Sequence, residues 1–253
     1  MKFNPAPNTV YHFTLTQFSI KRWTYQSKPV RVYDSVELDF SLQQEKKYDS
    51  LIYCKLAFNR FLWQAGKIHL NYKRGSMHAL PIDVVLNDSG QVVKVGNVDE
   101  VIEDVEKDSA TGKYLSGVTP DYISVSTITD MLNMVFSEIP ARKVKVNDTW
   151  VTDLTLNTNH TVHLSNFNVI KNRSGDTAAI AIQSNVFARR SPGDEFYING
   201  KRKGIALVNY STGIPYLYKT ESDVTTTMSY YDVKEIKKVT LKLDSSSKRK
   251  IKN

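Results

Sequence analysis

Apolar and polar residues alternate over most of this chain. Tyr11, Phe13 and Leu15 occupy every second position near the start, and the segment 36–42 repeats that spacing. Because successive side chains of a strand point to opposite faces, a period of two predicts half-buried antiparallel strands. The segment 51–63 is more uniformly apolar, which indicates a more central strand.

Turn residues separate the predicted strands. The runs 82–86 and 92–95 are joined through Asn87-Asp88-Ser89-Gly90, and Gly90 supplies the positive φ that a hairpin turn needs. After Trp150 the alternation resumes. The strands predicted there are 150–156, 161–169, 177–188, 204–209, 214–228 and 233–243.

Two helices interrupt the strands near the middle of the sequence. Apolar residues three and four positions apart over 98–105 predict an amphipathic helix, with Asn97 as its N-cap. The same spacing over 128–136 predicts a second helix, which ends before Pro140 because proline cannot continue it. The polar segment 108–121 connects the two helices.

Several short sequence segments of the first half recur in the second half. The residues 8–11 resemble 148–151, and the residues 82–90 resemble 205–213. Internal similarity of this kind predicts one domain built from two related units. The expected parts are a first β unit at 8–107, a connection with helix and junction at 108–147, a second β unit at 148–243, and a basic, disordered tail at 244–253.

The expected fold class is therefore mainly β. About eleven antiparallel strands in two related units form a curved sheet or an open barrel. The two helices at the midpoint cover one end of it or fill its concave side.

The charge balance is basic, with 34 Lys and Arg against 26 Asp and Glu, a formal net charge of +8 over 253 residues. The basic residues gather at Lys143 with Lys145, at Arg189-Arg190, at Lys201-Arg202-Lys203 and in the tail 248–252. Such clusters attract anionic polymers, but a solvated turn is the expected setting of Lys201-Arg202-Lys203. We expect no specific nucleic-acid binding.

Cys54 is the single cysteine, so an intrachain disulfide and a cysteine-based zinc cluster are both excluded. Its apolar surroundings predict a small buried side chain rather than a reactive thiol. No stretch approaches the roughly 20 apolar residues that a membrane-spanning helix needs.

No motif of nucleophilic or nucleotide chemistry is present. His160 and His163 are the closest pair of histidines, and their spacing of three within a predicted strand points them to opposite faces. We therefore expect no metal and no cofactor. A hydrolytic site would need carboxylates or His78 brought together by folding.

Aromatic residues are numerous, with 14 Tyr, 10 Phe and 3 Trp. Aromatic side chains fit pleated surfaces, so packing in the core and across strands explains most of them. Some of them are candidates for lining a ligand groove. These candidate ligand-binding residues are Trp23, Trp63, Tyr72, Tyr197, Tyr216 and Tyr218.

The segment 136–150 runs from Phe136 through Pro140 to the motif Asn147-Asp148-Thr149-Trp150. It resembles an uncharacterised family of exported lipoproteins from Bacteroides-type bacteria. The run 204–220 resembles the closing hairpin of the same family. Asn147 stands where that family usually has glycine. The resemblance implies a periplasmic or cell-surface protein of a Gram-negative bacterium, membrane association only through a lipid anchor outside this chain, and no known catalytic residue.

Together these patterns favour a non-enzymatic protein of the cell envelope, with a binding or structural role. Its concave β surface would hold an apolar or glycan ligand. Two alternatives stay open: a hydrolase that acts on envelope glycans or lipids, and a basic surface protein that docks anionic polymers.

Overall fold

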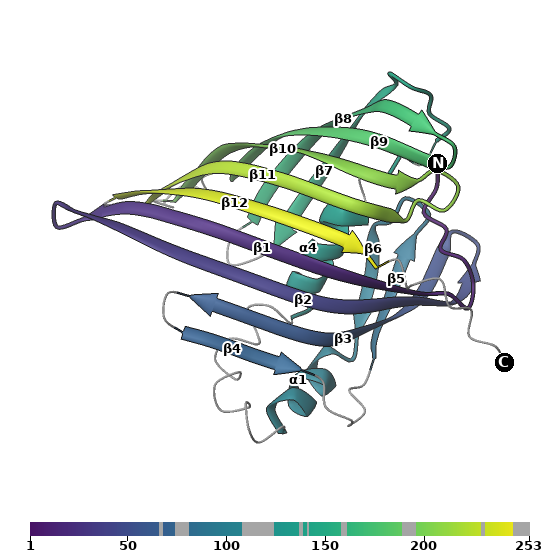
Figure 1. The fold of residues 1–253 in the computed structure, drawn as a ribbon, viewed down its shortest axis with the longest axis horizontal. Coiled ribbons are helices and arrows are strands. Elements are labelled where there is room, and N and C mark those ends of the chain that lie inside the picture. The colour runs from purple at the N-terminus through teal and green to yellow at the C-terminus, as the bar shows by residue number, and fades with distance from the viewer. Residues whose placement is uncertain are drawn as a thin grey trace.

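The fold was determined from a computed structural model (Figure 1). In 68–73, in 104–107 and at 157 the structure describes the backbone alone. The residues described are 1–65, 68–73, 81–107, 124–136, 139–140, 142–157, 161–188, 196–228 and 231–244.

The described strands form one antiparallel, 12-stranded sheet. The mainly β fold class is thus confirmed. The short β4, which the alternation did not predict, pairs with β3 beside the main path. The strands are β1 (Val10–Tyr25), β2 (Lys28–Tyr48), β3 (Leu51–Ala65), β4 (Ile68–Lys73), β5 (Ile82–Asn87), β6 (Val92–Gly96), β7 (Thr149–Asn157), β8 (Thr161–Ser174), β9 (Thr177–Ala188), β10 (Tyr197–Asn209), β11 (Pro215–Met228) and β12 (Tyr231–Leu243).

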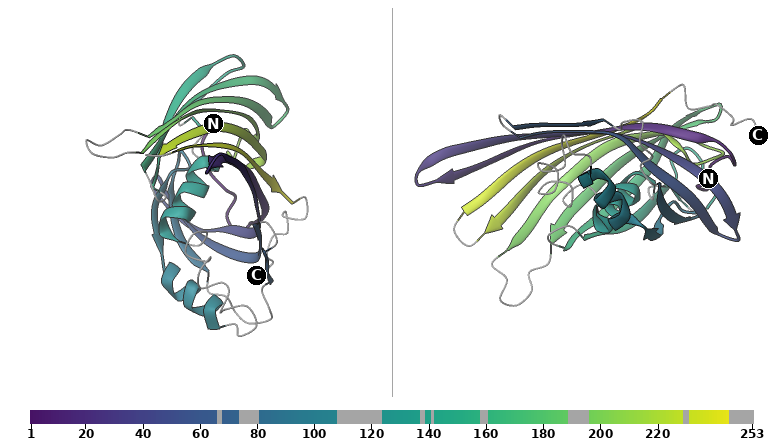
Figure 2. Two further views of the ribbon diagram at one scale, coloured as in Figure 1. Left: turned by 90° about the vertical axis from the view of Figure 1, so that its left-hand side faces the viewer. Right: turned by 90° about the horizontal axis from the view of Figure 1, so that it is seen from below.

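The sheet is strongly curved and open. Its strand order is β6-β5-β3-β2-β1-β12-β11-β10-β9-β8-β7, so the first and last strands of the chain pair in the middle. The two ends of this order, β6 and β7, do not pair with each other. The sheet therefore curves without closing into a barrel (Figure 2).

Two helices, α1 (Val98–Lys107) and α4 (Val125–Phe136), lie on the inner side of the curve (Figure 2). Helix α4 contacts β6, β7 and β11, so it lies across the opening between the two ends of the sheet. The Oγ of Ser124 accepts a hydrogen bond from the Thr127 N–H at 3.1 Å and caps α4. No described helix has the length and apolarity needed to cross a membrane.

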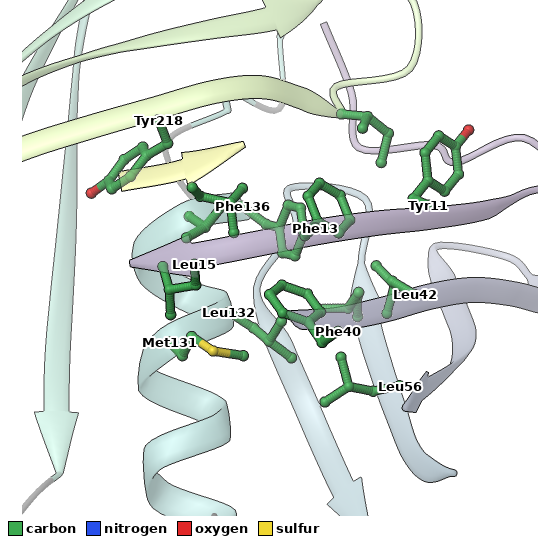
Figure 3. Close-up of a cluster of buried hydrophobic side chains, with 14 of the residues drawn as sticks. Tyr11, Phe13, Leu15, Phe40, Leu42, Leu56, Met131, Leu132, Phe136 and Tyr218 are labelled. Carbon is green, nitrogen blue, oxygen red and sulfur yellow. The ribbon is translucent and has the colours of Figure 1, made fainter. Parts of the chain in front are cut away.

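The main core lies between the inner face of the sheet and α4 (Figure 3). Phe13 of β1 stacks on Phe40 of β2 with ring centroids 5.2 Å apart, and Phe136 of α4 meets Phe13 at 5.9 Å. Cys54 is buried here as predicted, and burial raises the pKa of its thiol to about 12. The thiol is therefore protonated at neutral pH and unreactive.

An N-terminal segment bridges two hairpin turns at one end of the sheet, which we call the proximal end. The Phe3 N–H donates to the Asp88 carbonyl at 2.9 Å, and the Asn4 N–H donates to the Thr212 carbonyl at 2.7 Å. These bonds tie the β5–β6 turn to the β10–β11 turn. A Cβ on Gly213 would lie 2.7 Å from the Lys2 carbonyl oxygen, so only glycine allows this close approach.

The two bridged turns are those whose sequences resemble each other. In each turn an asparagine Oδ1 accepts the N–H of the serine two residues on, Asn87 from Ser89 and Asn209 from Ser211, both at 3.0 Å. A register shift precedes each asparagine, at Val85/Leu86 in one hairpin and at 207/208 in the other. The division of the domain into two related units remains a prediction, which a superposition of the units would test.

Two local predictions were wrong. Asn97 has a φ of 48° and does not cap α1 through its side chain, because its Oδ1 accepts the Asp83 N–H of β5 at 2.8 Å. The alternation of lysine and valine over 143–146 predicts a short edge strand. The segment is not a strand, since the Lys145 N–H donates to the Asp148 carboxylate in a turn before β7. The polar connection predicted at 108–121 and most of the basic tail lie outside the described residues.

Candidate functional site

A row of polar side chains crosses the inner face of the sheet. Cross-strand pairing places one polar residue of each of eight neighbouring strands in this row, from β7 to β2. An inner face that packs on a core usually carries apolar residues, so a continuous polar row is unusual. The polar row consists of Thr152, Asn166, Ser184, Arg202, Ser222, Lys237, Ser19 and Asp34.

Arg202 lies at the centre of the polar row and is only 5% exposed. Its Nε donates to Ser184 Oγ at 3.1 Å, its Nη1 to Tyr218 Oη at 2.7 Å, and its Nη2 to Asn166 Oδ1 at 2.9 Å. The solvated turn predicted for 201–203 is thus wrong. These residues lie within β10, and alternation turns Arg202 inward while both neighbours face solvent.

Lys237 continues the polar row on β12 beside charged neighbours. Its desolvation lowers the pKa of the amine, as does the nearby Lys21, whereas the carboxylates of Glu235 and Asp34 raise it. Lys21 and Glu235 stand directly opposite each other in the β1–β12 pair. The inner face therefore holds charged groups of both signs rather than a field of one sign.

Within the described part of the chain, three buried polar atoms near the polar row have no hydrogen-bond partner. They are Nδ2 of Asn166, Oδ1 of Asn168 and Nε1 of Trp63. The other amide atoms of both asparagines are bonded, since Asn168 Nδ2 donates to Thr152 Oγ1 at 2.9 Å. Buried polar atoms are bonded in most proteins, so these atoms are available to water or to polar groups of a ligand.

Beyond the polar row, towards the β1–β2 turn at Gln26 and Ser27, the inner face carries mostly apolar side chains, apart from the charged pair Lys21 and Glu235 on β1 and β12. We call this end of the sheet the distal end. On β7 to β10 its side chains are buried in a second cluster that includes Leu154, Leu164 and Val186, against which Met134 of α4 packs. This half of the distal face is already covered.

The other half of the distal face, on β11, β12, β1 and β2, is only partly covered. Its apolar side chains are half-buried, and Val32 is 37% exposed. Apolar surface of this kind on the inner side of a sheet is a candidate for binding an apolar molecule. We call it the distal patch, formed by Trp23, Val30, Val32, Val224 and Val233. Lys21 and Glu235 pair between Val32 and Val224, and Val224 also packs against the second cluster.

The structure does not bring the six predicted aromatic residues into one site. Trp23 belongs to the distal patch. Tyr218 is fully buried and bonded to Arg202, and Trp63 is half-buried against the main core. These three lie on the inner face, but in different rows.

The remaining three candidates lie elsewhere. Tyr216 accepts a hydrogen bond from Asn209 Nδ2 at 2.7 Å, next to the proximal β10–β11 turn. Tyr197 opens β10 at the distal end and is 44% exposed. Tyr72 belongs to β4, where the structure describes the backbone alone, and it pairs with Phe61 of β3. Sequence reasoning missed the polar row, because only the pairing of strands aligns its members.

The part of the chain that the structure describes contains no group of three or more His, Cys, Asp or Glu residues able to hold a metal ion. His163 stacks on Phe187 with ring centroids 5.4 Å apart, which is a packing role. His78 and His160 lie outside the described residues.

The model of one protein family matches residues 68–215, from β4 to the start of β11. The chain belongs to DUF6263. This family is described as a family of unknown function, so membership in DUF6263 assigns no activity. A search of curated proteins finds no match.

Among solved structures, this DUF6263 chain is similar to lipovitellin, in the structure "Lipid-protein interactions in lipovitellin". The TM-score is 0.54 at 12% identity, and the match covers 98% of this chain but 26% of that one. At this identity the likeness concerns the fold alone. A match to DynF, from the dynemicin biosynthesis pathway of Micromonospora chersina, covers 97% of this chain and 86% of that one at 6% identity. Its TM-score of 0.23 is too low to indicate a shared fold.

Proposed function

We propose that this protein is a non-enzymatic binding protein that holds an apolar, lipid-like ligand on the distal patch. The observation that carries the proposal is the half-covered apolar surface on β11, β12, β1 and β2, next to a row of polar groups. An apolar ligand would remove this surface from water, which favours binding in proportion to the area buried.

The polar row gives such a ligand an orientation. A polar end placed towards Ser222 and Lys237 would find hydrogen-bonding groups, while the apolar part lies over Val32 and Val233. The fold likeness to lipovitellin supports this proposal, because the lipovitellin structure is one of lipid-protein interactions. This support comes from the similarity of the two folds alone.

Binding of the uncharged fluorescent probe N-phenyl-1-naphthylamine tests the proposal. The double variant Val32→Asn with Val233→Asn is expected to weaken binding about tenfold, since about 1.4 kcal/mol of apolar contact is lost. The matched control, Val93→Asn with Val151→Asn, changes two exposed valines on β6 and β7 and should bind as the parent does. Equal weakening in both double variants, or no binding by the parent, would contradict the proposal.

A second measurement addresses the natural ligand. Organic extracts of the purified protein, analysed by mass spectrometry, are expected to contain a lipid that is depleted in the Val32/Val233 double variant but retained in the Val93/Val151 control. Extracts without any lipid in both parent and control would count against a carrier role.

We also propose that the protein works in the cell envelope. The support is the resemblance of 136–150 and 204–220 to exported lipoproteins, together with the proposed apolar ligand. In cell fractionation, the protein expressed from its complete gene is expected in the periplasmic or membrane fractions. Recovery in the cytosol alone would reject this placement.

A further inference from the structure

The β1–β2 hairpin reaches beyond the other strands at the distal end (Figure 1). Gln26 and Ser27 form its two-residue turn, with φ of 48° and 61°, the geometry of a tight hairpin that continues the twist of its strands. Every residue from Tyr25 back to Val10 pairs with a residue of β2. The projection is therefore a paired ribbon rather than a loose loop.

The charge of this hairpin is one-sided. Residues 20–33 contain Lys21, Arg22, Lys28 and Arg31 but no aspartate or glutamate. On the outer face, Arg22 stands directly opposite Arg31 in the β1–β2 pair and directly opposite Lys234 in the β1–β12 pair. We call Lys234, Arg22 and Arg31 the basic row.

The basic row lacks internal compensation. All three side chains are exposed, and none forms an ion pair with a carboxylate in the described part of the chain. Like charges directly opposite each other destabilise a sheet. Arg31 is instead held over the ring of Tyr33, 4.6 Å from its centroid. A polyanionic surface bound to the basic row would relieve the repulsion among its three cations.

A depression of about 970 Å³ lies along the basic row. All three cations line it, together with the single carboxylate Asp232, so its lining has an excess of positive charge. Tyr231 also lines it and is 39% exposed, and Tyr25 at the tip of the hairpin is 59% exposed. Exposed tyrosines beside arginine and lysine are typical of protein surfaces that enter the headgroup layer of a bilayer.

We propose that the distal hairpin docks this protein on the surface of an anionic phospholipid bilayer. The basic row contacts lipid phosphates, and Tyr25 enters the headgroup layer. Charge complementarity selects this partner, because the surface combines uncompensated cations with exposed tyrosines at a projecting tip. Docking of this kind needs neither the lipid anchor expected from the sequence nor a ligand on the distal patch.

Flotation with vesicles of phosphatidylcholine, with and without phosphatidylglycerol, tests the proposal. The full chain is expected to float with the anionic vesicles and not with the neutral ones. The triple variant Arg22→Gln, Arg31→Gln and Lys234→Gln is expected to bind on the order of 100-fold more weakly, because each basic residue near an anionic surface adds several-fold in affinity. Added salt is expected to weaken binding of the parent in the same direction.

Matched controls exclude a general effect of net charge. The variant Lys94→Gln, Lys143→Gln and Lys145→Gln removes three exposed cations outside the hairpin and is expected to keep most of the binding. Tyr25→Ser should weaken binding several-fold, whereas Tyr48→Ser, at the 71% exposed tyrosine of the proximal β2–β3 turn, should not.

Three outcomes would overturn the proposal. They are equal losses in the two triple variants, absence of binding to anionic vesicles, and binding to RNA or heparin through the basic row without vesicle binding. The naphthylamine probe separates this proposal from that of the distal patch. Arg22, Arg31 and Lys234 lie on the outer face, so their substitution should leave probe binding unchanged.

Discussion

Replacing Phe136 with alanine is expected to lower the free energy of unfolding by about 3–5 kcal/mol, the usual cost of deleting a fully buried aromatic ring. Phe136 ends α4 and is fully buried. Its ring lies 5.0 Å from Phe3 and 5.9 Å from Phe13, measured between centroids. It therefore joins the helix, the N-terminal segment and the centre of the sheet.

The loss should come from the cavity rather than from helix propensity, since alanine favours helices. Urea unfolding monitored by circular dichroism measures it. Val125→Ala is the matched control, because Val125 lies in the same helix and is 50% exposed. It should change stability by less than about 0.5 kcal/mol. Similar losses in the two variants would mean that α4 is not anchored through Phe136.

The strands could be predicted because each one obeys a local rule. The alternation that places Phe13 and Leu15 on one face of β1 is visible in the sequence and returns as burial in the structure. The turn at Asn87 to Gly90 could be predicted for the same reason, because a short segment contains all of its chemistry.

The order of the strands did not follow from such rules. The pairing of β1 with β12 joins Phe13 to Leu243 across nearly the whole chain. Nothing local in either segment specifies the other. The path of α4 across the opening between β6 and β7 is likewise a tertiary feature.

The polar row could not be predicted from the sequence for a related reason. Lys201-Arg202-Lys203 has the composition of a solvated turn, and the flanking lysines are indeed exposed. Only the register of β10 with β9 and β11 shows that Arg202 points inward, between Ser184 and Ser222. Ser19 and Asp34 join the same row from the other half of the chain. A row built from eight strands leaves no contiguous sequence signal.

The second large effect is expected at Arg202 itself. Arg202→Leu removes three hydrogen bonds donated by a buried charged group, to Ser184, Tyr218 and Asn166. Three buried polar groups lose their charged donor, and each buried group left unsatisfied costs about 1–3 kcal/mol, so the expected loss is on the order of 3–5 kcal/mol. Urea unfolding should show a loss of this size.

Two further variants serve as comparisons for Arg202→Leu. Lys201→Leu changes the exposed residue beside Arg202 and should stay within about 0.5 kcal/mol of the parent. Arg202→Lys keeps the positive charge but lacks the planar fork that reaches three acceptors at once, so its loss should lie between those of the other two variants.

Buried charged groups can sometimes be replaced by apolar residues without loss of stability. If Arg202→Leu proved as stable as the parent, the polar row would not be needed to hold β8, β9, β10 and β11 together. Burying these polar groups would then bring no gain in stability. A role in binding the polar end of a ligand would be the stronger reason for the presence of the polar row. If the expected loss is found, the row has a structural role, and the distal patch must account for ligand binding through its apolar contacts.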